Sequence, residues 1–211
     1  MQHDFQFVPK TEWLPVRKEL EKLINDVQND VRNEFTFSFT YVGSSGRNMV
    51  TRDLKSNVGY DFDVNIHIND DEENYSAGQI KHILMNAFNK FAHQYGYDYC
   101  EDSTRVITFK KKYYSTIIHS CDICIVFDCN DGRQQFIYFD KIQNSYDWKY
   151  LPVSNKTLEE HANWISHNGF LAEMKDIYLR KKNENDDPTK KSRSMYAESV
   201  NEVYMRHHKN K

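Results

Sequence analysis

Two carboxylates, Asp61 and Asp63, lie one residue apart in a run that alternates apolar with polar residues. Successive side chains of a strand point to opposite faces, so this run predicts a strand with one apolar face and one polar face. The apolar face comprises Tyr60, Phe62, Val64, Ile66 and Ile68, and the polar face comprises Asp61, Asp63, Asn65, His67 and Asn69. Residues two apart on one face lie roughly 6.5 Å apart, so both carboxylates can reach one Mg²⁺ ion or flank a pair of ions. The alternative interpretation is a half-buried strand whose solvent face is acidic, because Asp-x-Asp alone is common.

A turn suited to phosphate precedes this strand. Residues 35–41 alternate aromatic with hydroxyl-bearing side chains, which predicts a strand, and they lead into Gly43-Ser44-Ser45-Gly46. Glycine lets the backbone approach a ligand closely. Backbone N–H groups and serine hydroxyls at a strand end can hold a phosphate. Taken alone, the sequence is also typical of an ordinary turn.

Together these features resemble the DNA polymerase β-like nucleotidyltransferase superfamily. Its signature is a strand, a Gly-Ser turn, a short helix, and a strand that bears Asp-x-Asp or Glu-x-Asp. Gly43, Ser44, Asp61 and Asp63 match this signature. The interval of 17 positions from Ser44 to Asp61 is longer than in the smallest members. It is closer to the oligoadenylate synthetase-like and cyclic-dinucleotide-synthase-like branches.

The superfamily also places a third carboxylate on a later strand. Asp122 is the only Asp, Glu, Lys or Arg in the apolar run 117–127, where an ionised group is costly unless it is paired or bound to metal. The resemblance therefore implies that Asp61, Asp63 and Asp122 are catalytic and hold Mg²⁺ or Mn²⁺. It further implies that Gly43 and Ser44 seat the β- and γ-phosphates of a nucleotide.

The implied reaction moves a nucleoside monophosphate from an NTP to a hydroxyl acceptor and releases pyrophosphate. The acceptor is left open among another nucleotide, an RNA end, a protein hydroxyl and a small molecule. One alternative is a noncatalytic nucleotide-binding or partner-binding module with the same fold. A second alternative is a metal-dependent phosphodiesterase or nuclease, which would account less well for the Gly-Ser turn.

The C-terminal region adds a second group of candidate nucleotide-binding residues. Cations and hydroxyls gather at the start of the last expected helix, at Lys190, Lys191, Arg193 and Ser194. Such a helix start can bind phosphate oxygens. In enzymes of the superfamily a C-terminal helical part closes over the nucleotide, and the resemblance extends that role to these four residues.

Composition limits the remaining possibilities. The chain has 211 residues, 39% of them apolar, and a formal net charge of -3, which argues against a protein that coats DNA in bulk. We expect no membrane association, because no apolar run is long enough to span a bilayer. The N-terminus lacks a signal-peptide pattern, so we expect a cytoplasmic protein. Cys121 and Cys124 form a C-x-x-C, but strand alternation places the two thiols on opposite faces, and we expect reduced cysteines.

The expected fold is α+β (mixed α/β), a nucleotidyltransferase-like palm. In it a mixed, largely antiparallel sheet is backed by helices, and a small helical part follows. Residues 1–150 would form the catalytic domain and residues 151–211 the C-terminal helical subdomain. Periodicity predicts helices over 11–34, 76–95, 157–166 and 170–182, with a last helix that starts at Asp187-Pro188. Further strands are expected over 105–110, 115–127 and 134–139, with a lysine-rich turn at 110–112, a connecting segment over 140–155, and Asp128 as a turn residue.

Overall fold

The computed structural model describes residues 3–70, 74–152 and 156–208, which belong to two compact units. The first, called the sheet unit here, contains the described residues of 8–50 and 57–152. The second, the helical unit, contains the described residues of 1–7, 51–56 and 153–211. Compactness thus groups the N-terminal strand and residues 51–56 with the C-terminal helices. A functional boundary near residue 150 stays a prediction.

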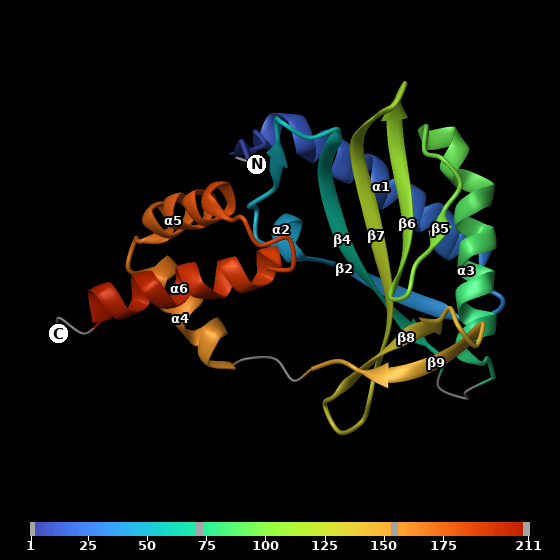
Figure 1. The fold of residues 1–211 in the computed structure, drawn as a ribbon. Coiled ribbons are helices and arrows are strands. Elements are labelled where there is room, and N and C mark those ends of the chain that lie inside the picture. The colour runs from blue at the N-terminus through green and yellow to red at the C-terminus, as the bar shows by residue number, and fades with distance from the viewer. Residues whose placement is uncertain (1–2, 71–73, 153–155, 209–211) are drawn as a thin grey trace. The chain divides into compact units, whose positions relative to one another are not determined.

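A mixed sheet of seven described strands forms the centre of the sheet unit (Figure 1). Its strands are β2 (Thr36–Val42), β4 (Val58–Asn69), β5 (Glu101–Asp102), β6 (Val106–Tyr113), β7 (Thr116–Asp128), β8 (Gln134–Asp140) and β9 (Ser145–Tyr150). Neighbours follow the order β2-β4-β7-β6-β5, while β8 pairs with the end of β7 and with β9. Only β4 and β7 run parallel among these pairs. The expected mixed, largely antiparallel sheet is therefore confirmed.

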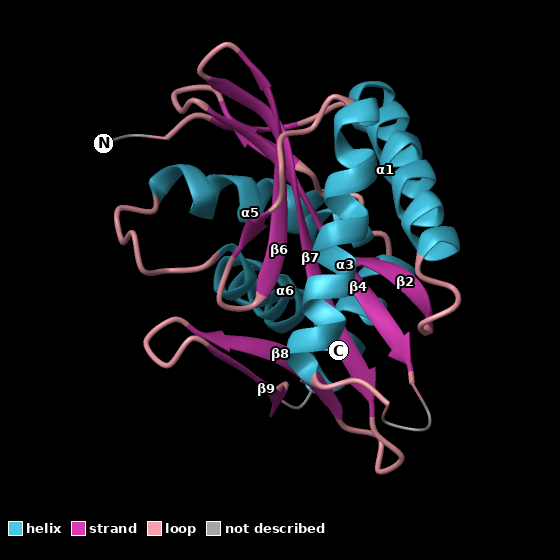
Figure 2. Cartoon of the chain, turned by 90° about the vertical axis from the view of Figure 1, so that its right-hand side faces the viewer, coloured by secondary structure: helices cyan, strands magenta, loops and turns pink. Residues whose placement is uncertain are grey.

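Two helices, α1 (Lys10–Asp30) and α3 (Ala77–Ala92), lie side by side against one face of this sheet (Figures 1 and 2). The apolar side chains of β4 face them. Phe62, Val64 and Ile66 are fully buried, and burial of each such side chain contributes roughly 1.5–3 kcal/mol. The alternation predicted for β4 is confirmed, and it leaves the other face of the sheet to polar residues.

Local signals set the helix ends. Ser76 and Gln79 form a capping box at the start of α3. After a short 3₁₀ turn, Gly96 takes a left-handed conformation with φ of 75° and ends the helical segment. The helix expected from Thr11 begins one residue earlier, and its N-cap is Pro9 without a side-chain cap.

Two expectations for the sheet were wrong. The lysine run 110–112 does not form the β6–β7 turn, because β6 continues to Tyr113 and the turn lies at Tyr114 and Ser115. Lys110 is paired with Glu101 across the sheet. Residues 145–150, expected in a connecting segment, form strand β9 and pair with β8 in antiparallel register.

The helical unit combines a short strand pair with three helices. Strands β1 (Phe5–Phe7) and β3 (Thr51–Asp53) are antiparallel, and the helices are α4 (Lys156–His167), α5 (Leu171–Glu184) and α6 (Ser192–His208). The last helix does not start at Asp187-Pro188, because the Asp187 carboxylate accepts hydrogen bonds from the backbone N–H and hydroxyl of Thr189 and forms a turn. No helix within the described residues is both long and apolar enough to cross a bilayer.

Candidate active site

Strand pairing brings the predicted carboxylates together on the polar face of the sheet. Asp63 of β4 and Asp122 of β7 are direct register partners in the parallel pair, and Asp61 is the register partner of Ser120. Neighbouring strands lie about 4.8 Å apart. Asp61, Asp63 and Asp122 therefore occupy one face of two adjacent central strands, as their alternation in sequence predicts.

Burial and neighbouring like charges dominate the electrostatics of Asp63 and Asp122. Burial raises the pKa of Asp63 to about 7, and the charges of Asp61 and Asp122 add to this effect, while Arg47 opposes it. Burial also raises the pKa of Asp122, and Asp61 acts in the same direction. The hydroxyl of Thr108 donates to Asp122 Oδ1 at 2.6 Å and partly offsets the rise. Strongly shifted pKa values of this origin are typical of functional sites.

The Gly-Ser turn forms the wall beside Asp63. Residues Gly43–Gly46 make a single helical turn, α2, directly after β2, where the sequence signature expects a short helix. Gly43 has φ of +59°, and a Cβ atom there would lie 2.0 Å from Asp63 Oδ2. Only glycine fits this backbone conformation at this distance from the carboxylate. Ser44 is half-buried, and the buried hydroxyl of Ser45 donates to the carbonyl of Val42.

The donor set suits a hard divalent cation. Asp61, Asp63 and Asp122 supply carboxylate oxygens, the ligands that Mg²⁺ prefers, and a cation would relieve their mutual repulsion. Across residues 3–70, 74–152 and 156–208, no group of three or more His, Cys, Asp or Glu side chains has metal-holding geometry. The three carboxylates thus share a face and fit the charge and chemistry of Mg²⁺ without converging on one point.

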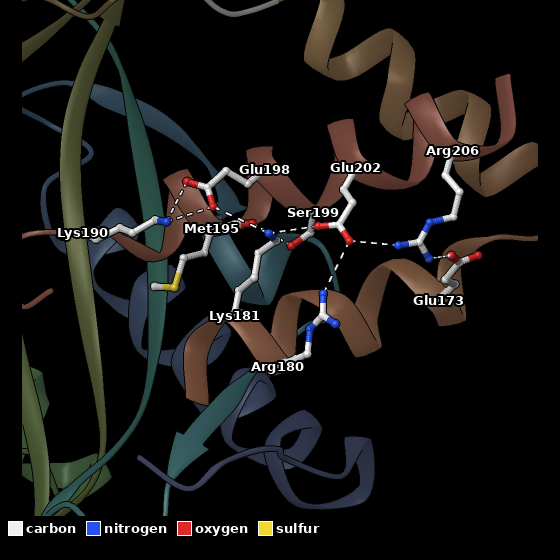
Figure 3. A network of polar contacts seen from close by, with 9 residues as sticks. All are labelled: Glu173, Arg180, Lys181, Lys190, Met195, Glu198, Ser199, Glu202 and Arg206. Carbon is white, nitrogen blue, oxygen red and sulfur yellow. Dashed lines mark hydrogen bonds and ion pairs between the residues drawn. The ribbon is translucent and has the colours of Figure 1, made fainter. Parts of the chain in front are cut away.

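The C-terminal candidates lie in the helical unit. Lys190 Nζ is 2.8 Å from Glu198 and belongs to a network of ion pairs between α5 and α6 (Figure 3). Lys191, Arg193 and Ser194 are exposed where α6 begins. Their action on a triphosphate, and that of Lys190, stays a prediction.

Sequence reasoning missed a second polar cluster in the sheet unit. His67 Nδ1 lies 2.8 Å from Asp128 Oδ2, and His67 Nε2 lies 2.9 Å from the hydroxyl of Thr40. Gln134 donates to Asp128 Oδ1 at 2.6 Å. Asp128 is the last residue of β7 and accepts the bonds from His67 and Gln134. The interpretation of Asp128 as a turn residue did not include these bonds. The signal available in the sequence was the position of His67 on the same alternating face as Asp63.

The cysteines follow strand alternation. Cys121 is buried on the core face of β7, whereas Cys124 is half-buried on the opposite face, in register with Asn65. All four cysteines of the chain are free thiols. Burial raises the pKa of Cys124 to about 11, which keeps the thiol protonated and a poor nucleophile at neutral pH.

Comparison with known proteins places this geometry in a known fold. No protein-family model and no curated protein matches the sequence significantly. Among solved structures, the cyclic AMP-GMP synthase DncV of Vibrio cholerae, in complex with the linear intermediate 5' pppA(3',5')pG, superposes with a TM-score of 0.57. The two are 17% identical, over 88% of this chain and 50% of that chain. The chain has the CD-NTase fold.

Two further structures with the CD-NTase fold agree. Bradyrhizobium diazoefficiens CdnG in complex with GTP gives a TM-score of 0.53 at 14% identity, over 74% of this chain and 42% of that chain. Escherichia coli DncV, bound to 3'-deoxy GTP, gives a TM-score of 0.56 at 14% identity, over 88% of this chain and 51% of that chain. The resemblance to polymerase β-like nucleotidyltransferases is thereby confirmed at the level of the fold. The chain spans about half the length of these relatives.

Proposed function

We propose that this chain is a magnesium-dependent nucleotidyltransferase, which transfers a nucleoside monophosphate from an NTP to a hydroxyl acceptor and releases pyrophosphate. The observation that carries the proposal is the group of three carboxylates on one face of β4 and β7, two of them with raised pKa values. The CD-NTase fold, solved elsewhere with NTPs and their analogues, supports it. Because NTPs and Mg²⁺ are supplied inside cells, we place the reaction in the cytoplasm.

Each residue has a role that its position suggests. Asp61 and Asp63 would hold the metal that binds the triphosphate, and Asp122 would share a second metal. Gly43, whose backbone lies against Asp63, and Ser44 would seat the β- and γ-phosphates through backbone N–H groups and the hydroxyl. Asp122 would also help to take the proton of the attacking hydroxyl.

Mg²⁺, when bound, would lower the pKa of the nucleophile and neutralise the charge that builds on the α-phosphate and on pyrophosphate. The protein's own part is to keep the carboxylates in fixed register, which the parallel pairing of β4 and β7 does. In the helical unit, Lys190, Lys191, Arg193 and Ser194 are the candidates for binding phosphate oxygens. For Lys190 this requires release from its ion pair with Glu198.

The test is pyrophosphate release from each of the four NTPs with Mg²⁺ or Mn²⁺, with mass spectrometry of the products. We expect metal-dependent release by the wild-type chain and loss of release by Asp61→Ala and Asp63→Ala. A new nucleotidylated species would identify the acceptor class. The proposal would be abandoned for a noncatalytic module if no pyrophosphate formed and if NTP with Mg²⁺ left the melting temperature unchanged.

A further inference from the structure

A chain of hydrogen bonds crosses the polar face of the sheet beside the carboxylates. It runs from the Thr40 hydroxyl on β2 to His67 on β4 and from His67 to Asp128 on β7, where Gln134 of β8 also donates. The three bonds measure 2.9, 2.8 and 2.6 Å. Four strands thus contribute one residue each, and the hydroxyl at the end of the chain belongs to an exposed residue of an outer strand.

The order of these groups fixes the direction of the hydrogen bonds. Burial acts to raise the pKa of Asp128, but hydrogen bonds from Gln134 and His67 outweigh it and lower the pKa, so Asp128 is a carboxylate that only accepts. In the neutral imidazole that donates through Nδ1 to Asp128, the lone pair of Nε2 accepts from the Thr40 hydroxyl. A hydroxyl, an imidazole base and an orienting carboxylate in this order are the parts of an activated nucleophile.

Strand register places this hydroxyl next to the candidate active site. Val42 is the register partner of Asp63, and Thr40 lies two residues before Val42 on the same face of β2. With about 3.4 Å per residue and about 4.8 Å between strands, the Cα atoms of Thr40 and Asp63 are about 8 Å apart. Gly43, at the proposed triphosphate seat, follows Val42 directly.

A hollow beyond His67 can hold the rest of a nucleotide. It has a volume of about 740 Å³ and is lined by Ser38, His67, Asn69, Asp128 and Asn130, among others, and its size is within the range of small-molecule sites. His67 lies four residues from Asp63 on the same face, about 13 Å along the strand. A nucleotide with its phosphates at Gly43 and its base in this hollow would carry its α-phosphate past Thr40.

We infer that Thr40 is a self-nucleotidylation site, with a protein hydroxyl of this chain as the acceptor. This inference rests on the proposed function, except that His67, in place of Asp122, takes the proton of the attacking hydroxyl. His67 Nε2 takes the proton of Thr40 as the Thr40 oxygen forms a bond to the α-phosphorus. The bond from the α-phosphorus to the bridging oxygen breaks, and pyrophosphate leaves with the electron pair. The products are Thr40 esterified to a nucleoside monophosphate and free pyrophosphate, with the proton on His67 passing to solvent.

The alternative interpretation is that the hydrogen-bond chain has only a structural role and holds the four strands together. Under that reading His67→Gln and Thr40→Val lower the melting temperature and no adduct forms on any variant. If the Thr40 hydroxyl is the nucleophile, Thr40→Ser must keep the adduct, whereas Thr40→Val must lose it. The serine variant thus separates a nucleophile from a packing residue.

The experiment incubates the full chain with Mg²⁺ and each NTP, followed by intact-mass measurement, peptide mapping and assay of pyrophosphate. We expect one added nucleoside monophosphate on Thr40 in wild type and in Thr40→Ser, and none in Thr40→Val. Adduct formation should slow by about 10²–10⁴-fold in His67→Gln, the usual range for loss of a general base. Ser115→Ala, in the exposed β6–β7 turn, serves as the matched control and should keep the adduct.

An unmodified Thr40 overturns the inference in every case. Pyrophosphate release without an adduct on Thr40 would leave the proposed function standing, with another acceptor. If no pyrophosphate formed and NTP with Mg²⁺ gave no thermal shift, both the inference about Thr40 and the proposed function would be wrong. An adduct that forms at the same rate in His67→Gln would also contradict the inference, because Thr40 would then not depend on the relay.

Discussion

Two groups of carboxylates, one in each unit, are in opposite electrostatic situations. In the sheet unit Asp61, Asp63 and Asp122 lie near one another, and burial together with like charge raises the pKa of Asp63 and Asp122. In the helical unit each acid of the α5–α6 network faces cations (Figure 3). A hydrogen bond from Lys181 lowers the pKa of Glu202 there, and Arg180 and Arg206 act in the same direction.

This difference shows which charged groups stabilise the fold and which destabilise it. Paired surface charges such as those of Glu202 contribute about 0.2–1 kcal/mol each and tie α5 to α6. Clustered carboxylates weaken the fold unless a cation is bound. The clustered carboxylates on β4 and β7 are therefore a stronger indication of function than the paired charges of α5 and α6.

Removal of one clustered charge should give the largest effect. Asp63→Asn should lower nucleotidyl transfer by at least about 10²–10³-fold, the cost of losing one group that stabilises transition-state charge. It should also raise the melting temperature, because a like charge is removed. Steady-state pyrophosphate assays and thermal denaturation check both parts. Full transfer activity in Asp63→Asn would contradict the claim that the clustered carboxylates, unlike the paired acids of the helical unit, serve catalysis.

Gly43→Ala should have the second-largest effect, a loss of stability. The new Cβ would meet Asp63 Oδ2, and the residue would keep a left-handed φ, which by itself costs about 1–3 kcal/mol for a non-glycine residue. Gly132→Ala is the matched control, with φ of +81° and nothing within 4 Å of its Cβ. Chemical denaturation should show a larger loss of stability for Gly43→Ala than for Gly132→Ala. Equal losses would mean that contact with Asp63 adds nothing.

The pH dependence should follow the raised pKa of Asp63. The folded chain holds this proton up to about pH 7, whereas the unfolded chain releases it near its ordinary value of 3.8. Stability from this group is therefore lost as pH rises from about 4 to about 7. The melting temperature of Asp63→Asn minus that of wild type should widen across this window and then level off. A difference that stays constant with pH would show that Asp63 titrates normally.

The smallest effect should come from the paired region. Glu202→Gln should cost about 0.2–1 kcal/mol in the free energy of unfolding, and the cost should shrink at high salt because exposed charges are screened. Transfer activity should not change. Denaturation at low and high NaCl, with Glu184→Gln at an exposed position of α5 as the control, measures this. A loss well above 1 kcal/mol would make the network a larger contributor than surface pairs usually are.

The sequence was most informative where alternation and burial agree. The two faces of β4, and the shared face of Asp61, Asp63 and Asp122, follow from period two alone once β4 and β7 pair. Strand β9 was missed because the apolar residues of 145–150 become a strand only through pairing with β8. The relay through His67 also depends on register, since Thr40, Asp128 and Gln134 come from three other strands.

Metal binding by the clustered carboxylates is the most direct test of the account. Free Mn²⁺ can be titrated by electron paramagnetic resonance with wild type, Asp63→Asn, Asp122→Asn and Glu202→Gln. We predict saturable binding by wild type and by Glu202→Gln, with binding at least tenfold weaker in Asp63→Asn and in Asp122→Asn. No binding by wild type, or equal binding by all four proteins, would contradict the assignment of these carboxylates as a metal site.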